Sequence, residues 1–494
     1  MPSTLLIAHQ TKSLLTHYNS CLMIRLYNTP ARSLTPFKPI HPKIVSIYSC
    51  GPTVYDRQHI GNLRKSLFDD LLKRTLQLHN YNVYSVTNIT DVGHLVNDDE
   101  DTGEDKLEKG AKREQLTAQE VALKYTNLWK EDLAKLNIIP SDHYPKATEY
   151  IREQINLIKR LERKGYTYIT SDGVYFDTTK FPEYADFAHL KLNAQEAGSR
   201  VEMGEKKSNS DFALWKFSPK GDVRQMEWNS PWGIGFPGWH SECVVMADSL
   251  LHAPFDIHTG GKDHIPIHHT NEIAQFKADT GKPMANYWLH SYFLTVNTAK
   301  MSKSAGTFIT LDEIIEQGYC PLDLRLLVLM AHYRSDIDFS WESLTQAKQT
   351  RQRIIDFINR VNLVKTHRKN PKLQKLIRDT YNNFKKSLFS DLDSPKAIAF
   401  MFEFIKEVNT AIDAGDPIPR RHIIKLFQRL ERVLALDLPL TKPDIPAEII
   451  EIFNQRNQAR ANKDFAQADK LRQELSNLGY TIQDKEGQSV IIKT

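Results

Sequence analysis

The spacing of apolar residues in the first 90 positions predicts a strand, a loop, a helix and a second strand. Residues 44–49 form a short β-prone run that ends at Cys50. Apolar side chains then recur at helical spacing over 63–72, and Asn80 offers a stop. Residues 81–90 form the next β-prone run. A unit of this kind predicts a parallel sheet, in which ligands bind beyond the carboxyl ends of the strands.

This pattern is interrupted over residues 125–235 and then resumes. The interruption contains a helical stretch, a β-prone run over 166–176 and a segment rich in Gly, Pro and Trp. Strand signals return at 255–258 and 288–296. The simplest interpretation is an α/β protein whose Rossmann-like parallel-sheet domain is split by an inserted connective segment.

The remainder of the chain is predicted to be helical. We expect helices from Trp341 to about Leu438, with Ser394 as the cap of one segment and Pro395 in its first turn. Residues 447–478 favour a helical hairpin that Gly479 closes. The predicted domains are an N-terminal extension (1–22), two halves of the sheet domain (23–124 and 236–310), the insertion (125–235), a connection (311–342), a helical domain (343–438) and a C-terminal helical hairpin region (439–494).

Composition fits a large multidomain protein of the soluble class. A chain of 494 residues is too long for one compact core, and 40% apolar with 25% charged residues argues against wholesale disorder. No run approaches the roughly 18 apolar residues that a membrane helix needs. Four scattered cysteines do not make a disulfide scaffold, so we expect a reducing, cytoplasmic compartment and treat some cysteines as candidate metal ligands.

Residues 1–22 need a separate interpretation. They contain Lys12 but no acid and no arginine, and they are rich in Ser and Thr, as a weak transit peptide can be. The interpretation that we favour is that Met23 is the true start, or that the segment is a disordered tail. Neither interpretation gives it a catalytic role.

Charge is concentrated rather than spread along the chain. The net charge of +5 points only weakly to an anionic partner. Between residues 346 and 378, however, ten basic residues oppose Asp356 alone. Such a run is either a solvated helix face or a surface for the backbone of a nucleic acid. The acidic run over 98–105 is expected to be a mobile surface loop rather than a metal site.

Two short motifs are candidates for phosphate binding. The sequence His-Ile-Gly-Asn at 59–62 follows the first predicted strand, and Lys-Met-Ser-Lys-Ser at 300–304 follows the last strand of the sheet domain. Two lysines and two serines on a short loop suit a polyphosphate better than a packed core. This ordered pair of motifs resembles the class I aminoacyl-tRNA synthetases.

Adenylate formation, the first reaction that this resemblance implies, needs positioning and charge stabilisation rather than a protein nucleophile. His59 and Asn62 can hydrogen-bond phosphate oxygens, and Gly61 lets backbone amides approach them. Lys300 and Lys303 would neutralise the charge that develops on the β- and γ-phosphates. ATP with Mg²⁺ is the expected substrate.

Four further residues are candidate metal ligands: Cys50, Cys243, His268 and Glu272. Three borderline-to-soft ligands and one carboxylate suit tetrahedral Zn²⁺. His268 and Glu272 lie four apart, so a helix puts them on one face. By spacing alone His269 would serve equally well, and the positions are too dispersed for a standard zinc signature.

Three segments resemble cysteinyl-tRNA synthetases: 48–56 (YSCGPTVYD), 237–243 (PGWHSEC) and 268–272 (HHTNE). The likeness runs from Met23 to the C-terminus. It places the zinc ligands of that family on Cys50, Cys243, His268 and Glu272. It also implies that the helical domain and the C-terminal region hold a tRNA for cysteine, with an anticodon-binding function.

The resemblance implies how the amino acid is selected. A zinc ion that accepts the sulfur of cysteine as a thiolate rejects serine, whose hydroxyl is a harder ligand with a far higher pKa. Such a test needs no hydrolytic editing site. Thr53, Thr90, Trp239 and Asp263 match family positions around the amino acid and the nucleotide, although Trp239 is otherwise a plausible core aromatic. We expect a monomeric, cytoplasmic cysteine–tRNA ligase with no membrane partner.

Some positions depart from the family pattern. Asn62 stands where histidine is often found, Thr259 where glycine is frequent, and Thr270 where glutamate is frequent. His264 and His94 are alternative ligands, for which a surface or supporting role is the preferred interpretation. Two rival functions remain: a cysteine ligase whose acceptor is an amino-sugar, and a non-catalytic RNA-binding relative that keeps the fold.

Overall fold

The computed structural model describes residues 23–93, 95–97, 102–190, 205–219, 224–296, 301, 307–364, 369–440, 446–485 and 488–493. The predicted extension 1–22, Cys21, His94, most of the acidic run and both lysines of the KMSKS motif lie outside these residues.

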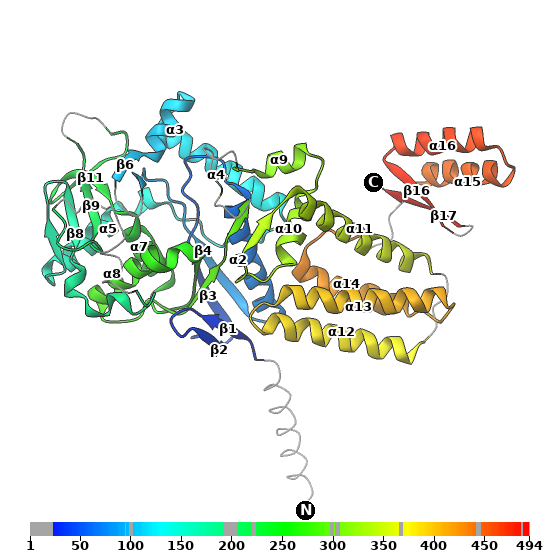
Figure 1. Ribbon diagram of the computed structural model, residues 1–494, viewed down its shortest axis with the longest axis horizontal. Coiled ribbons are helices and arrows are strands. Elements are labelled where there is room, and N and C mark those ends of the chain that lie inside the picture. Colours follow the sequence, from blue (N-terminus) through cyan, green and yellow to red (C-terminus); the bar gives the residue numbers. More distant parts are fainter. Residues whose placement is uncertain are drawn as a thin grey trace, which may run out of the picture.

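A four-stranded parallel sheet forms the centre of the molecule (Figure 1). Its strand order is β13 (Ala285–Ser291), β12 (Phe255–Gly261), β3 (Ile44–Ser49) and β4 (Asn82–Thr87). Helix α2 (Ile60–Leu78) connects β3 to β4. Because β3 and β12 are neighbours although they lie some 200 residues apart in sequence, the predicted parallel sheet, split by an insertion, is confirmed.

The insertion carries a five-stranded antiparallel sheet of its own, in the order β10, β11, β9, β8, β7. The β-prone run over 166–176 is a hairpin rather than one strand, because Thr170 turns the chain by bonding Asp172 and Gly173. Helix α3 (Lys106–Glu114) precedes the insertion, and α4 (Ala118–Lys135) leads into it. The other elements of this region are α5 (Ile151–Arg163), β7 (Thr167–Ile169), β8 (Gly173–Phe176), β9 (Phe212–Phe217), β10 (Trp228–Ser230) and β11 (Gly233–Pro237), with 3-10 turns at Ala147–Tyr150, Thr178–Lys180 and Pro182–Ala185.

The predicted strand over 288–296 is likewise two strands. Tyr292 donates its backbone N–H to the Tyr333 carbonyl at 2.8 Å, and Phe293 donates to Asp336 at 2.9 Å, so the chain leaves the sheet there. The second strand pairs with β15 instead. The remaining elements of the sheet domain and connection are β1 (Arg25–Asn28), β2 (Ser33–Pro36), β5 (Leu95–Asn97), β6 (Thr102–Asp105), α7 (Trp239–Leu251), α8 (Thr270–Thr280), β14 (Leu294–Val296), α9 (Leu311–Glu316), α10 (Pro321–Leu329) and β15 (Ile337–Phe339).

The predicted helical stretch from Trp341 to about Leu438 is confirmed, and its described residues form α11 (Trp341–Leu363), α12 (Pro371–Phe389), α13 (Ser394–Asp413) and α14 (Arg420–Leu434). The predicted cap of α13 is wrong by one position. Asp393 accepts the N–H of Lys396 at 3.1 Å and is the true cap, whereas Ser394 is the first helical residue and is buried. A carboxylate is as good a helix cap as a hydroxyl, and proline in the first turn fits either position.

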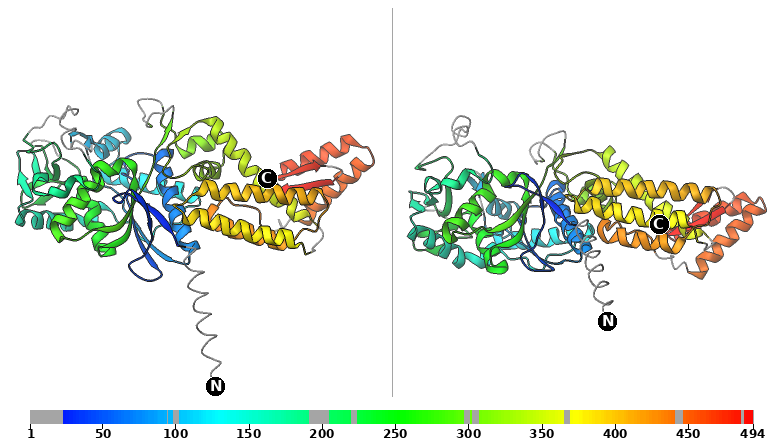
Figure 2. Two further views of the ribbon diagram at one scale, coloured as in Figure 1. Left: turned by 60° about the horizontal axis from the view of Figure 1, so that its bottom comes forward. Right: turned by 90° about the horizontal axis from the view of Figure 1, so that it is seen from below.

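The C-terminal unit confirms the helical hairpin and adds a β-hairpin. Helices α15 (Ala447–Ala461) and α16 (Phe465–Asn477) are followed by strands β16 (Tyr480–Lys485) and β17 (Gln488–Lys493). Ile449, Leu475, Tyr480 and Ile482 form its own small core. All views place this unit beyond the helical bundle, at the opposite end of the molecule from the insertion (Figures 1 and 2).

One hydrophobic core joins the sheet domain to the bundle. Val45, Leu72 and Leu76 from β3 and α2 belong to the same buried cluster as Phe357 and Phe427 from α11 and α14. A continuous core of this kind favours a fixed arrangement of the two parts. Among the described residues, no helix has the length and apolar character needed to cross a membrane.

A buried ion pair reinforces this junction. Arg325 of α10 is fully buried and bonds Asp70 of α2 at 2.5 Å, the Leu434 carbonyl of α14 at 2.6 Å and the Leu136 carbonyl at 2.9 Å. Its five N–H groups therefore link three segments that are distant in sequence.

We predict that Arg325→Leu destabilises the protein by about 3 kcal/mol, because it leaves buried carbonyls and part of Asp70 without a donor. Chemical denaturation that follows the transition of the sheet domain and bundle measures this loss. The control is Lys375→Met, which removes an exposed ion pair to Asp379 on α12 and should cost roughly 1 kcal/mol or less. Equal stability of the two variants would contradict the role assigned to Arg325.

Candidate active site and metal centre

The HIGN motif forms the N-terminus of α2. His59 is the N-cap residue, and the Asn62 backbone N–H donates to its Nδ1 at 3.3 Å. A Cβ at Gly61 would lie 2.8 Å from Cε1 of His59, so the imidazole packs where only glycine fits. Burial lowers the pKa of His59 to about 4. The ring is therefore neutral at pH 7, and because Nδ1 accepts a hydrogen bond, Nε2 carries the proton that can be donated to a phosphate.

The segment after the KMSKS motif is attached to the HIGN motif. The Ile60 N–H donates to the Ile309 carbonyl at 2.9 Å, and His59 and Thr310 form an isolated β-bridge. The Phe308 ring meets the His59 ring edge-on at 5.3 Å. Lys300 and Lys303 lie outside the described residues, but the segment 308–310 that follows the motif lies against His59 and Ile60.

A cleft of about 220 Å³ lies beside them. HIGN residues His59, Gly61 and Asn62 line one part of it, and Cys50 and Asp263 line others. Met301 of the KMSKS motif also lines it. The cleft is bounded by residues that follow β3 and β12, which is where parallel sheets bind ligands.

The four predicted ligands converge beside this cleft. Cys50 follows β3, Cys243 lies on α7, His268 lies in a π-helical turn (Ile265–His269), and Glu272 lies on α8. Their ligand atoms all lie within 4.8 Å of one another, and all four residues are buried. His268 Nε2 lies 2.7 Å from Glu272 Oε1, as the four-residue spacing predicts.

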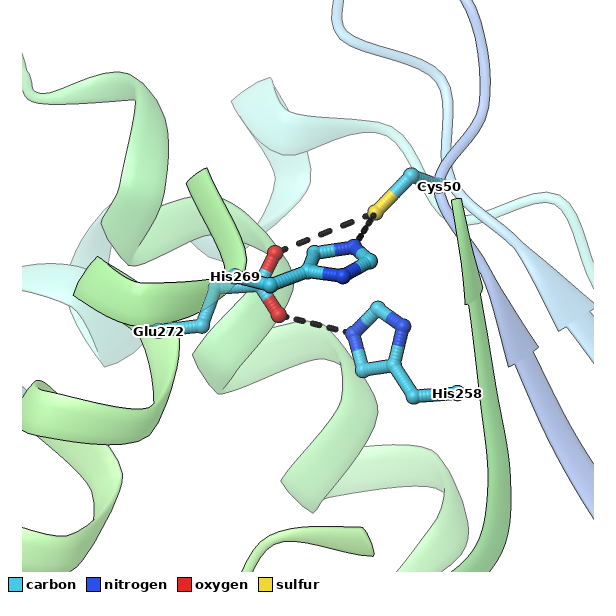
Figure 3. A group of neighbouring side chains, drawn as sticks. All are labelled: Cys50, His258, His269 and Glu272. Carbon is cyan, nitrogen blue, oxygen red and sulfur yellow. Dashed lines mark hydrogen bonds and ion pairs between the residues drawn. The ribbon is translucent and has the colours of Figure 1, made fainter. Parts of the chain in front are cut away.

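A second set of ligands overlaps the first and was missed by the sequence interpretation. Cys50, His258, His269 and Glu272 also bring their ligand atoms within 4.8 Å (Figure 3). His258 Nε2 lies 2.7 Å from Glu272 Oε2, and His269 Nε2 lies 3.3 Å from Cys50 Sγ. His269 therefore remains an alternative to His268 as a metal ligand. Only the parallel pairing of β12 with β3 brings His258 here, and no local spacing indicates that.

The second ring nitrogens of His268 and His269 are already bonded, whereas Nδ1 of His258 is buried and has no hydrogen-bond partner among the described residues. His268 Nδ1 lies 3.1 Å from His240 Nδ1, and His269 Nδ1 lies 2.8 Å from His290 Nε2. Such contacts orient metal-binding histidines so that the free nitrogen faces the ion. Two thiols, an imidazole and a carboxylate held in this way fit a divalent ion of borderline softness.

The electrostatics of the cluster favour the charged forms of Glu272, His268 and Cys50, whereas burial and the neighbouring Cys50 raise the pKa of the Cys243 thiol well above its usual range. Burial raises the pKa of Glu272, but His258 and His268 outweigh this effect and lower it to about 2. Burial lowers the pKa of His268, but Glu272 and Cys50 raise it to about 10. Burial also opposes ionisation of the Cys50 thiol, yet its hydrogen bond with Cys243 and the nearby His269 lower its pKa well below the usual range. Opposite charges thus compensate for burial here.

Two of the four predicted substrate residues contact the cluster or line the cleft. Trp239 begins α7, and its ring lies 4.3 Å from the ring of His268, so it covers the ligand cluster. Asp263 lines the cleft from a 3-10 turn (Lys262–His264). Thr53 and Thr90 form a β-bridge with each other, and Thr90 donates to Glu242 at 3.0 Å, but neither lines the cleft. His264 lines the cleft near His268, whereas His94 lies outside the described residues.

Comparison with known proteins gives the class of the chain. A family model described as the tRNA synthetases class I (C) catalytic domain matches residues 36–349. Two solved structures of Mycobacterium tuberculosis methionyl-tRNA synthetase, with methionyl-adenylate, have TM-scores of 0.57 and 0.58 at 14% and 15% identity. They cover 87% and 86% of this chain, which covers 96% of each of them, and at this identity they show the fold alone. The chain belongs to the class I aminoacyl-tRNA synthetases.

Closer relatives specify the family within this class. A second family model, the cysteinyl-tRNA ligase anticodon binding domain, matches residues 442–489. Cysteine–tRNA ligase 1 of Burkholderia lata is 43% identical over 94% of this chain and 96% of its own length. The cysteine–tRNA ligase of Treponema denticola is 38% identical over 95% of this chain and 99% of its own length. This chain therefore belongs to the cysteine–tRNA ligase family, as the sequence motifs predicted.

The lowered pKa of His59 has a measurable effect on stability. Between pH 6.5 and about 4 the unfolded chain protonates this residue more readily than the folded chain, so stability is lost as the pH falls through that range. His59→Asn keeps a helix cap and removes the titration. We predict that, on going from pH 7 to pH 4.5, the wild type loses about 2 kcal/mol more unfolding free energy than the variant does. Denaturant unfolding at both pH values tests this; parallel pH profiles would contradict it.

Proposed function

We propose that this chain activates L-cysteine with ATP to form cysteinyl-adenylate and transfers the cysteinyl group to the 3′-terminal adenosine of a tRNA for cysteine. The observation that carries the proposal is the position of the buried ligand cluster at the side of the HIGN cleft, with Cys50 common to both. A thiol-recognising site next to a phosphate-binding site is what this reaction needs.

In the first step, an oxygen of the substrate carboxylate attacks the α-phosphorus of ATP. The bond from that phosphorus to the bridging oxygen breaks, and pyrophosphate leaves with the electron pair. Neutral His59 donates from Nε2 to a phosphate oxygen, and Asn62 donates from its amide. Lys300 and Lys303 balance charge on the departing pyrophosphate, which Mg²⁺ accompanies. Because no covalent enzyme intermediate is needed, the residues act by positioning and charge.

We propose that Cys50, Cys243, His268 and Glu272 hold one Zn²⁺ ion. When bound, the ion supplies a soft Lewis-acid centre that prefers a thiolate to a hydroxyl. Trp239 closes the cluster beside His268 and restricts the side chain that can enter. Thr53, Thr90 and Asp263 complete the surroundings of the amino acid and nucleotide.

The helical domain and the C-terminal unit are the proposed tRNA-binding parts. The basic run at the start of the bundle fits phosphate contacts that weaken with salt. Transfer follows attack of the terminal 2′-hydroxyl on the adenylate carbonyl, with AMP as the leaving group. We assign the sheet-domain halves to 23–124 and 236–310, the insertion to 125–235, the connection to 311–342, the helical domain to 343–438 and the C-terminal region to 439–494. We expect a cytoplasmic monomer.

Two assays with the purified protein test this function. We predict ATP–pyrophosphate exchange that depends on cysteine and not on serine, and attachment of cysteine to total tRNA. A ligase with an amino-sugar acceptor would show the exchange but leave the tRNA uncharged. A non-catalytic RNA-binding relative would show neither reaction, and either result would contradict the proposal.

The ligand set is tested by comparing two variants. Cys243→Ser removes a thiolate from the proposed set, so we predict that bound zinc falls at least tenfold and that the cysteine KM rises with it. His258→Gln, which alters the second set, should retain zinc. Metal analysis of both purified variants measures this. Zinc lost from the His258 variant and kept by the Cys243 variant would assign the ion to the second set.

A further inference from the structure

Lys65 occupies a position on α2 that none of the assigned roles uses. It lies one turn after the HIGN motif and lines the same cleft as His59 and Asn62. Its side chain is only 15% exposed. Among the described residues that line the cleft, it is the one lysine or arginine, so it supplies the fixed cation of this part of the site.

Its ammonium group is held by two bonds. Nζ donates to the backbone carbonyl of Cys50 at 2.7 Å and to Asp69 Oδ2 at 2.7 Å. Asp69 is the residue one turn further along α2, so the two side chains share a helix face. An ammonium has three N–H donors, and these contacts use two of them.

Asp69 is itself fixed by the sheet. Its Oδ1 accepts from Thr259 Oγ1 at 2.8 Å, and Thr259 Oγ1 lies 2.7 Å from Ser49 Oγ. Ser49 and Thr259 are register partners of β3 and β12, and both are fully buried. The chain of contacts from Ser49 to Lys65 therefore fastens the ammonium to the rigid strands that carry the cleft.

Thr259 is one of the departures from the family pattern noted in the sequence. A glycine there would give Asp69 no hydroxyl donor, so the threonine belongs with Asp69 and Lys65 as one arrangement. In the described structure the hydrogen bonds of the Thr259 hydroxyl go to Asp69 and Ser49, and neither is a candidate metal ligand. Its role is to orient Asp69, and through it Lys65.

We propose that Lys65 is a substrate-binding residue of the activation step, and that its third N–H donates to the oxygens that join the cysteine carboxylate to the α-phosphate. This inference rests on the proposed function and specifies one of its contacts. Lys65 bonds the Cys50 backbone, next to the proposed thiol-binding cluster, and lines the same cleft as the HIGN residues. The bond that forms in the first step must join a substrate held at the thiol-binding cluster to a phosphate held at the HIGN motif. Negative charge increases on the α-phosphate oxygens as the carboxylate attacks, so a fixed cation there stabilises the transition state more than the bound substrates.

The test compares Lys65→Met, Lys65→Arg and the control Lys124→Met in ATP–pyrophosphate exchange. Lys124 also forms a lysine–carboxylate ion pair, to Glu114 at 2.6 Å, but its side chain is half-exposed and does not line the cleft. We expect Lys65→Met to lower kcat roughly 10²-fold with KM values little changed, because the lost contact forms mainly in the transition state. Lys65→Arg, which keeps the charge, should recover most of the loss. Lys124→Met should match wild type.

A binding measurement accompanies the kinetics. A sulfamoyl analogue of cysteinyl-adenylate, titrated by calorimetry, should bind Lys65→Met at least tenfold more weakly than wild type, with bound metal and thermal midpoint preserved. If Lys65 only fastens the Cys50 carbonyl, the variant instead loses metal and its cysteine KM rises while kcat holds, and the proposal is overturned. It is also overturned if Lys65→Met behaves as Lys124→Met does. Wild-type protein without cysteine-dependent exchange would contradict the proposed function itself, while analogue binding would still report on Lys65.

Discussion

The parallel pairing of β3 with β12 is the constraint on which the site depends. Register partners Ile47–Ile257, Tyr48–His258 and Ser49–Thr259 place the ends of both strands side by side, and the Cys50 N–H continues the pairing by donating to the Thr259 carbonyl at 3.0 Å. This pairing brings a cysteine from the first half of the domain to the helices that carry Cys243, His268 and Glu272. Without it the ligands would remain on two separate halves of the chain.

Helix α2 connects this constraint to the rest of the molecule. Its N-terminus forms the HIGN cleft, its first turns reach the strand ends through Lys65 and Asp69, and Asp70 meets the buried Arg325. Over 19 residues, or roughly 28 Å, the helix runs from the cleft to the core of the bundle. One rigid element thus positions the HIGN cleft, the strand ends and the helical domain relative to one another.

Much of this arrangement could be predicted from sequence because its signals are local. A short β-prone run identified β3, and helical spacing identified α2 and the pair His268 and Glu272. The rest depended on contacts between distant segments. The hydrogen bonds of Tyr292 and Phe293 to residues 333 and 336 split a predicted strand, and His258 joined the ligand cluster only through pairing with β3. Family resemblance supplied Cys50 and Cys243 as ligands, which spacing alone did not.

We propose that a metal in the buried cluster recognises the thiol of the substrate directly. The most direct measurement replaces the metal with Co²⁺ and records the thiolate-to-cobalt charge-transfer absorption while cysteine or serine is added. Cysteine should increase this absorption by adding a thiolate to those of Cys50 and Cys243, and serine should leave it unchanged. Identical spectra with the two amino acids, or a protein that binds no metal, would contradict the account.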